Sequence, residues 1–349
     1  MAVESRARDY SLIGPEGAKA QEKGLAGAAW YQSPIPRKQL KDLMQRSDGP
    51  ALRDTAIWIA ALALSGSAAA WLWGTWWCVP AFFVYGVLYG SSSDSRWHEC
   101  GHRTAFKTRW MNDVVYQLAC FMILREPTVW RWSHARHHTD TIIVGRDPEI
   151  AVPRPAYIPG ILLNLFALKS GAKAVRLLFI HAAGRLAPEE ETFIPEAEHG
   201  RVYVVARIYL AIFAAVAAAC AAVASILPAM LIGLPTFYGG WLAVVFGVTQ
   251  HAGLAEDILD HRLNSRTVTM NPLLRFLYWN MNYHVEHHMF PAVPYHALPR
   301  LHAVVKSDCP PPYPSLWAAY AEIVPALLRQ SKDPSYCVRR MPGAVAGSR

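Results

Sequence analysis

Charged residues are missing from two long stretches of this 349-residue sequence. Residues 55–93 and residues 208–255 contain no Asp, Glu, Lys or Arg. A bilayer crossing takes about 20 apolar residues, so each stretch is long enough for two crossings. The composition agrees, with 53% hydrophobic residues against 17% charged residues. These absences exclude an ordinary soluble domain and predict a polytopic membrane protein.

Paired cysteines are also missing. The six cysteines are scattered and form no C-x-x-C pair. This spacing supports neither a disulfide framework, nor a zinc ribbon, nor a fused iron–sulfur domain. Residues 1–30 show no short apolar core behind a basic start, so we expect no cleavable signal peptide. The net charge is +8, but no basic block belongs to a recognisable nucleic-acid module, so we expect no nucleic-acid partner.

Each charge-free stretch divides at a turn into two expected spans. The spans are 55–73 and 77–92 in the first stretch, and 208–226 and 230–248 in the second. Lys and Arg are absent from the far turns and frequent on the near flanks, so the positive-inside rule places the flanks in the cytoplasm. We expect an all-α protein with four transmembrane helices in two hairpins and a cytoplasmic helical cap. The Arg- and Ala-rich composition favours a bacterial inner membrane.

We divide the sequence into a polar N-terminal lead (1–50), a main domain (51–330) and a C-terminal tail (331–349). In the lead, residues 37–47 place Leu and Met at helical spacing among lysines, which predicts a short basic amphipathic helix. Residues 158–180 mix apolar residues with Lys and Arg. That mixture predicts a helix lying in the membrane plane, not a crossing.

Eight of the 14 histidines lie in three clusters. The clusters are His98 and His102; His134, His137 and His138; and His284, His287 and His288. Residues three and four apart share one face of a helix, and imidazole is the commonest metal ligand. Eight ligands suit two ions better than one, and iron is the redox-active metal that nitrogen ligands hold with positions open to oxygen. The clusters predict a histidine-ligated di-iron site that uses O2.

The first cluster also fits a second motif. His98, Glu99 and His102 match H-E-x-x-H, in which two His bind zinc and the Glu acts as general base. A membrane zinc hydrolase is therefore an alternative, although it would leave the other two clusters unused. A non-catalytic, receptor-like metal-binding membrane protein is a further alternative.

Residues outside the clusters complete the expected site. His251 ends the expected fourth span, and ionisable groups at such positions are functional candidates, so we take it as the ninth ligand with His261 as its alternative. His302 has no ligand spacing, and its replacement is expected to do little. Carboxylates near the clusters are candidates to support catalysis by accepting the second N–H of the ligands. These candidates are Glu99, Glu286, Asp140 and also Asp147.

In order and spacing, the three clusters resemble the histidine boxes of the membrane fatty acid desaturase family. The segment from Asn282 to Pro291 is similar to that family's third box, and the resemblance covers about residues 50–305. It implies two irons that activate oxygen and remove hydrogen from an unactivated carbon of a fatty acyl or lipid-like substrate. It also implies a further ligand at the position of His251. Some members of the family hydroxylate their substrates instead.

The resemblance also bears on partners and substrates. No haem-binding cytochrome b5 segment is recognisable at either end, so we expect a separate electron donor, a ferredoxin or a cytochrome b5-like protein with its reductase. The segments 250–256 and 294–299 are similar to a bacterial branch that includes dihydrorhizobitoxine desaturase and rhizopine oxygenase. That similarity implies an alternative activity, the desaturation or hydroxylation of a small amino-acid- or sugar-like metabolite.

Overall fold

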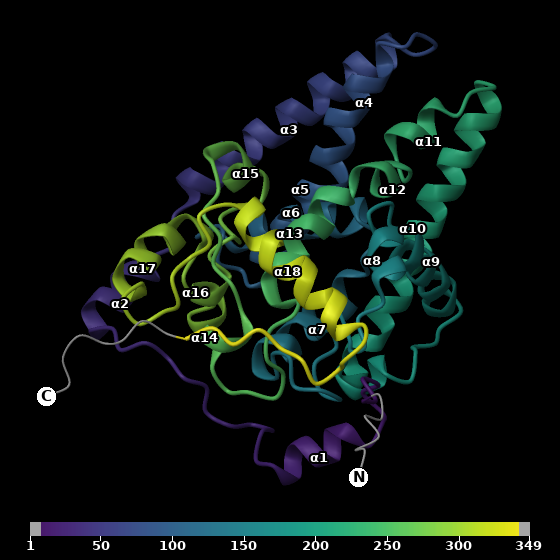
Figure 1. Ribbon diagram of the computed structural model, residues 1–349. Coiled ribbons are helices and arrows are strands. Elements are labelled where there is room, and N and C mark those ends of the chain that lie inside the picture. Colours follow the sequence, from purple (N-terminus) through teal and green to yellow (C-terminus); the bar gives the residue numbers. More distant parts are fainter. Residues whose placement is uncertain (1–7, 342–349) are drawn as a thin grey trace, which may run out of the picture. The chain divides into compact units, whose positions relative to one another are not determined.

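The computed structural model describes residues 8–341 (Figure 1). The outermost residues of the expected lead and tail, 1–7 and 342–349, lie outside the described residues. The α-helices are α1 (Glu16–Glu22), α2 (Arg37–Leu43), α3 (Asp48–Trp71), α4 (Cys78–Gly86), α5 (Ser92–Gly101), α6 (Arg109–Met122), α7 (Pro127–Thr139), α8 (Ile158–Asn164), α9 (Leu168–Ala182), α10 (Glu196–Ala222), α11 (Leu227–Leu231), α12 (Pro235–Gly239), α13 (Trp241–His251), α14 (His261–Asn264), α15 (Pro272–Leu277), α16 (His284–Met289), α17 (Leu298–Val305) and α18 (Leu316–Gln330). Shorter helical turns are η1 (Val87–Ser91), η2 (Glu190–Thr192) and η3 (Tyr295–Ala297). Within residues 8–341 there is no strand, and two isolated β-bridges are the extent of β pairing. The expected all-α fold is confirmed.

The chain divides into two compact units. Among the described residues, unit 1 consists of 8–46, 133–159 and 246–341, and unit 2 consists of 47–132 and 160–245. The second and third histidine clusters and His251 therefore belong to unit 1. The first cluster and nearly all of the two charge-free stretches belong to unit 2.

In unit 2, α3 and α4 pack together as a hairpin (Figure 1). The turn between them contains Gly74 at φ +86°, a conformation that glycine adopts without steric cost. Trp58 is fully buried on α3 and donates its Nε1–H to the Leu88 carbonyl at 2.8 Å, which fixes α3 against the chain after α4. α4 continues through the π-helical turn η1 into α5. The charge-free hairpin thus leads directly into the first histidine cluster.

The second charge-free stretch is less regular than expected. Among the described residues, α10 is the helix that is long and apolar enough, by length and composition, to cross a membrane. The expectation of a single helix over 230–248 is wrong, because the segment is broken into α11, α12 and the start of α13. Gly233 at φ +95° and Pro235 at the start of α12 produce the break, since neither suits a helix interior.

Two other expected helices are present. Residues 37–43 form α2, as the amphipathic pattern predicts. The expected helix over 158–180 is divided into α8 and α9. The division falls at Ala167, whose backbone is left-handed at φ 50°.

In unit 1, the short helix α16 carries the third cluster and is buried over its whole length. It packs against α14 and α17. Trp279 stacks on Tyr295, with ring centroids 4.4 Å apart, beside the loop that enters α16. Arg262 on α14 forms ion pairs with Asp260 and Asp308, both at 2.8 Å. These contacts hold a six-residue helix that could not be stable alone.

Candidate metal centre

The first cluster lies at the end of α5 in unit 2. His98 is on the last turn and His102 caps the helix, which brings their ring centroids to 5.3 Å. Glu99 is fully buried and accepts a hydrogen bond from Thr104 Oγ1 at 3.3 Å. Its Oε1 lies 3.8 Å from His98 Nδ1, beyond hydrogen-bond length. Because a general base must reach a reacting water, this burial does not favour Glu99 as the base of a zinc hydrolase.

The second cluster occupies the C-terminal part of α7, where carboxylates orient two of its rings. Glu149 Oε2 accepts from His134 Nδ1 at 2.9 Å, and Asp147 Oδ2 accepts from His137 Nδ1 at 2.8 Å. Each contact keeps the proton on Nδ1 and leaves a lone pair on Nε2. Burial alone would lower the pKa of His137, but the Asp147 carboxylate outweighs it and raises the pKa. With the proton held on Nδ1 by these carboxylates, the neutral form of each ring has its Nε2 lone pair available to a metal ion.

His251 joins the third cluster at the end of α13. Its Nδ1 donates to the Asn264 carbonyl at 2.7 Å, which directs the Nε2 lone pair toward His284. The two Nε2 atoms are 2.9 Å apart, and His288 Nε2 is 3.0 Å from His284 Nε2. Burial places the pKa of His251 well below its usual value, so the ring is neutral.

His261, the alternative ninth ligand, has a different environment. Its ring stacks on Trp30, with centroids 4.2 Å apart and planes 2° from parallel. Burial lowers its pKa to about 3. Among the described residues whose donor atoms gather closely, His251 is present and His261 is not.

Two sets of imidazole nitrogens gather within unit 1, and in each set the donor atoms lie within 4.8 Å of one another. The first set includes His134, His138 and His287, and the second is His137, His251, His284 and His288. Neighbouring Nε2 atoms are 2.9–3.2 Å apart in both sets. A metal–nitrogen bond of about 2.1 Å separates two ligands at right angles by about 3.0 Å. The spacing therefore fits nitrogen ligands around one metal ion in each set.

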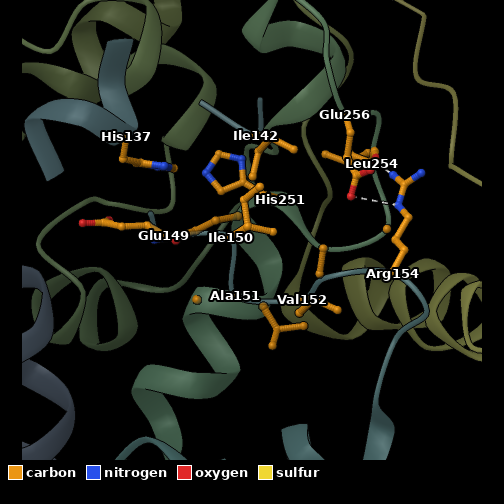
Figure 2. A pocket seen from close by; sticks show the side chains of 15 residues that line it. His137, Ile142, Glu149, Ile150, Ala151, Val152, Arg154, His251, Leu254 and Glu256 are labelled. Carbon is orange, nitrogen blue, oxygen red and sulfur yellow. Dashed lines mark hydrogen bonds and ion pairs between the residues drawn. The ribbon is translucent and has the colours of Figure 1, made fainter. Parts of the chain in front are cut away.

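A small cavity of about 70 Å³ adjoins the second set. Figure 2 shows the rings of His137 and His251 beside it, with Arg154 and Glu256 in the opposite part of its lining. Arg154 Nε lies 3.2 Å from Glu256 Oε1, and Tyr10 donates its hydroxyl to the same carboxylate at 2.8 Å. The lining mixes these charged groups with aliphatic side chains. The cavity is therefore suited to a small group of mixed polarity.

Three of the four carboxylates singled out in the sequence contact residues outside the clusters. Asp140 accepts from the guanidinium groups of Arg136 and Arg146, each through Nε at 2.9 Å. Glu286 accepts from Thr267 Oγ1 at 2.6 Å and contacts His302 Nδ1. Glu99 bonds to Thr104, as described above.

Asp147, the fourth of these carboxylates, and Glu149 accept hydrogen bonds from rings of the second cluster. Glu149 was not among the residues singled out in the sequence. The available signal was its place two residues after Asp147, in an acidic segment that closely follows the second cluster.

Comparisons with known proteins show which family this chain belongs to. The fatty acid desaturase family model matches residues 74–320. The omega-6 fatty acid desaturase, endoplasmic reticulum isozyme 1, of Glycine max is 38% identical over 78 residues, 22% of this chain and 20% of that protein. The sn-1 oleoyl-lipid 12-desaturase of Synechocystis is 27% identical over 114 residues, 31% of this chain and 32% of that protein.

A longer match is a probable fatty acid desaturase of Sorghum bicolor, 26% identical over 304 residues, 77% of this chain and 70% of that protein. The matched segment thus spans a fifth to a third of the Glycine max and Synechocystis proteins and more of the Sorghum bicolor one. The family model spans most of the chain, including all three histidine clusters and His251. The chain belongs to the fatty acid desaturase family.

Proposed function

We propose that this protein is a di-iron, O2-dependent membrane desaturase that removes two hydrogens from an unactivated C–C bond of a fatty acyl or lipid-like substrate. The observation that carries the proposal is the pair of imidazole sets in unit 1, in which neighbouring Nε2 atoms lie 2.9–3.2 Å apart. His98 and His102, at helical ligand spacing on α5, are proposed as further metal ligands. Membership of the fatty acid desaturase family supports the reaction type.

Iron is the metal that suits these ligands. Imidazole nitrogens with open positions are typical of iron in oxygen chemistry, and the iron would supply that redox chemistry. The protein's part is to keep the ligands oriented. Asp147, Glu149 and the Asn264 carbonyl hold protons on Nδ1 of three rings, which leaves each Nε2 free to bind. The cluster residues His284, His287 and His288 are buried, so bulk water is kept from them.

A second candidate function uses the same centre on a smaller substrate. The cavity beside His137 and His251 is about 70 Å³ and includes Glu149, Arg154 and Glu256 in its lining. Mixed charge at a site of that size favours a small polar metabolite over an acyl chain. Hydroxylation or desaturation of an amino-acid- or sugar-like molecule is therefore the alternative reaction.

The proposed setting is a bacterial inner membrane crossed four times, with the histidine clusters on the cytoplasmic side. The crossings are 55–73, 77–92, 208–226 and 230–248, the last one passing through the interrupted segment α11–α13. Electrons would come from a separate ferredoxin or cytochrome b5-like donor. Reporter fusions after Asp48, Thr75, Gly145, Pro228 and Arg349 should read in, out, in, out and in. A periplasmic signal at Gly145 would contradict this topology.

Metal content and product analysis test the enzymatic proposal. Protein purified from iron-supplemented cells should contain about two irons per chain, whereas one zinc would support the hydrolase alternative. His134→Ala and His287→Ala should each lose iron and activity, because each removes a ligand from the first set. Comparison of lipids and small metabolites in cells with and without the gene then separates the two substrate classes. Full activity in both variants would overturn the di-iron proposal.

A further inference from the structure

Unit 2 contains an apolar groove of about 320 Å³, formed by α9, α10 and the α11–α12 segment, which lie beside one another (Figure 1). Val175 and Phe179 of α9 form one wall, and Phe213 and Ala217 of α10 form another. The lining is almost wholly apolar, and Ile232 closes the third side. All residues that line this apolar groove belong to unit 2.

The apolar groove is open along one side. Phe179 is 59% exposed, and Val175 and Ile232 are each 39% exposed. Exposure of this apolar surface to water is unfavourable, so an apolar molecule that covers it would stabilise the protein. Phe213 and Ala217 lie on α10, the helix long and apolar enough to cross a bilayer. The groove is therefore positioned to face hydrocarbon chains.

The shape of the apolar groove depends on a backbone turn. Gly233 at φ +95° lies in the turn between α11 and α12. A Cβ there would lie 3.2 Å from the Phe213 ring, so a larger residue would both strain the turn and press on the groove wall. The shape of the groove therefore depends on the interruption between α11 and α12.

Basic residues accompany the apolar wall of α9. Lys169, Lys173 and Arg176 are exposed and spaced i, i+4 and i+7, which puts them on one face of the helix. Val175 and Phe179 lie on the neighbouring apolar face. One helix therefore presents a row of cations next to an apolar wall. A molecule with an anionic head and a hydrocarbon tail matches that combination.

We propose that the apolar groove binds one acyl chain of an anionic phospholipid, whose phosphate is held by Lys173 and Arg176. The lipid is a resident of unit 2 that fills the space between α9 and α10. The inference rests on the membrane placement of α10 and makes no use of the metal centre.

The test is the lipid content of the full-length protein purified in mild detergent, measured by native mass spectrometry and by extraction. Wild-type protein should retain one anionic phospholipid per chain. Ala217→Trp fills the groove and should lower that occupancy about tenfold or more, because a bulky ring takes the volume of the chain. Ala215→Trp is the matched control, since Ala215 is exposed on α10 outside the groove lining.

The headgroup is tested separately. The double variant Lys173→Gln/Arg176→Gln should lower the preference for anionic over zwitterionic phospholipid roughly 25-fold at low salt, because each basic residue near an anionic headgroup contributes roughly fivefold. Lys107→Gln, an exposed lysine elsewhere in unit 2, should leave the preference unchanged.

Three results would overturn the proposal: no retained phospholipid in wild-type protein, equal retention in Ala217→Trp and Ala215→Trp, or a free fatty acid as the retained molecule. Iron content, measured on the same samples, should not differ between the two tryptophan variants. If the metal proposal is wrong, the iron measurement will show it, and the lipid measurement can still be interpreted.

Discussion

His302 on α17 contacts Glu286 on α16, His302 Nδ1 against Glu286 Oε1. The second oxygen of Glu286 accepts from Thr267 Oγ1 at 2.6 Å, and the carboxylate is fully buried. Glu286 stands between His284 and His287 in the third cluster. Both of its oxygens are therefore held by residues from other segments. The contact makes His302 a positioning residue for the helix that carries three metal-ligand candidates.

The first prediction is that His302→Ala lowers iron affinity, because it leaves one oxygen of a buried carboxylate unpaired on the helix that carries three ligand candidates. From the sequence alone this replacement is expected to do little, whereas the contact with Glu286 leads us to expect a loss of affinity. His302→Gln should recover part of the loss because its amide can still donate to the carboxylate. The measurements are iron titration and the absorption spectrum of the cobalt-substituted protein, which reports ligand geometry.

His199→Ala is the control for this prediction, since His199 bonds to the Ile194 carbonyl in unit 2 and not to a cluster residue. It should titrate like wild type. An unchanged cobalt spectrum and iron affinity in His302→Ala would show that the contact between His302 and Glu286 does not affect the ligands on α16.

The second prediction separates two nearby carboxylates. Asp147→Asn replaces the charged carboxylate that orients His137 at 2.8 Å with a neutral amide and should weaken iron binding about 10- to 100-fold. Asp140→Asn breaks ion pairs with Arg136 and Arg146 and should leave iron affinity within about twofold of wild type. Iron titrations of the two variants, with thermal unfolding as a check on folding, give the comparison. A larger loss of iron affinity in Asp140→Asn than in Asp147→Asn would show that Asp140 is the carboxylate that orients the ligands.

The histidine clusters could be predicted because their information is local. In His134, His137 and His138, spacing alone decides which rings share a helix face. The carboxylate partners could not be predicted in the same way. Asp140 is nearer in sequence to the second cluster than Asp147, but the path of the chain through residues 140–149 turns Asp140 to two arginines and Asp147 to His137.

The membrane segments show a similar division between composition and geometry. The absence of charged residues identifies an apolar stretch at 230–248. Its interruption depends on the backbone at Gly233 and Pro235, which a hydropathy pattern does not register. The Gly-Leu-Pro sequence at 233–235 is the local signal that indicates a break.

The third prediction concerns His251 and His261. His251→Ala should lower bound iron and abolish turnover, because its Nε2 lies in the second set, 2.9 Å from that of His284. His261→Ala should retain iron, since its ring stacks on Trp30 and contributes no atom to either set. Its effect should be on stability, through the lost stacking contact. Iron content and product formation of the two variants are measured together; loss of iron in His261→Ala with retention in His251→Ala would exchange their roles.

Glu126, in unit 2, is a buried carboxylate with an unusual titration. Burial raises its pKa to about 7, against the smaller opposing effects of the Val129 N–H, which donates to it at 2.6 Å, and of His181. His181 itself pairs with Glu190, with Nε2 and Oε2 2.8 Å apart. Because the folded protein binds the Glu126 proton more tightly than the unfolded chain does, protonation of Glu126 stabilises the fold.

The last prediction follows from that sign. The stabilisation is fully present below the unfolded pKa near 4.5 and is lost as the pH rises through about 7. The total change is up to about 3 kcal/mol, the free-energy equivalent of the shift. Glu126→Gln cannot titrate, so its melting temperature in detergent should fall less than that of wild type between pH 5 and pH 8. Parallel melting curves for the two proteins over this range would show that Glu126 is charged in the folded state throughout, and that its neighbours compensate for its burial.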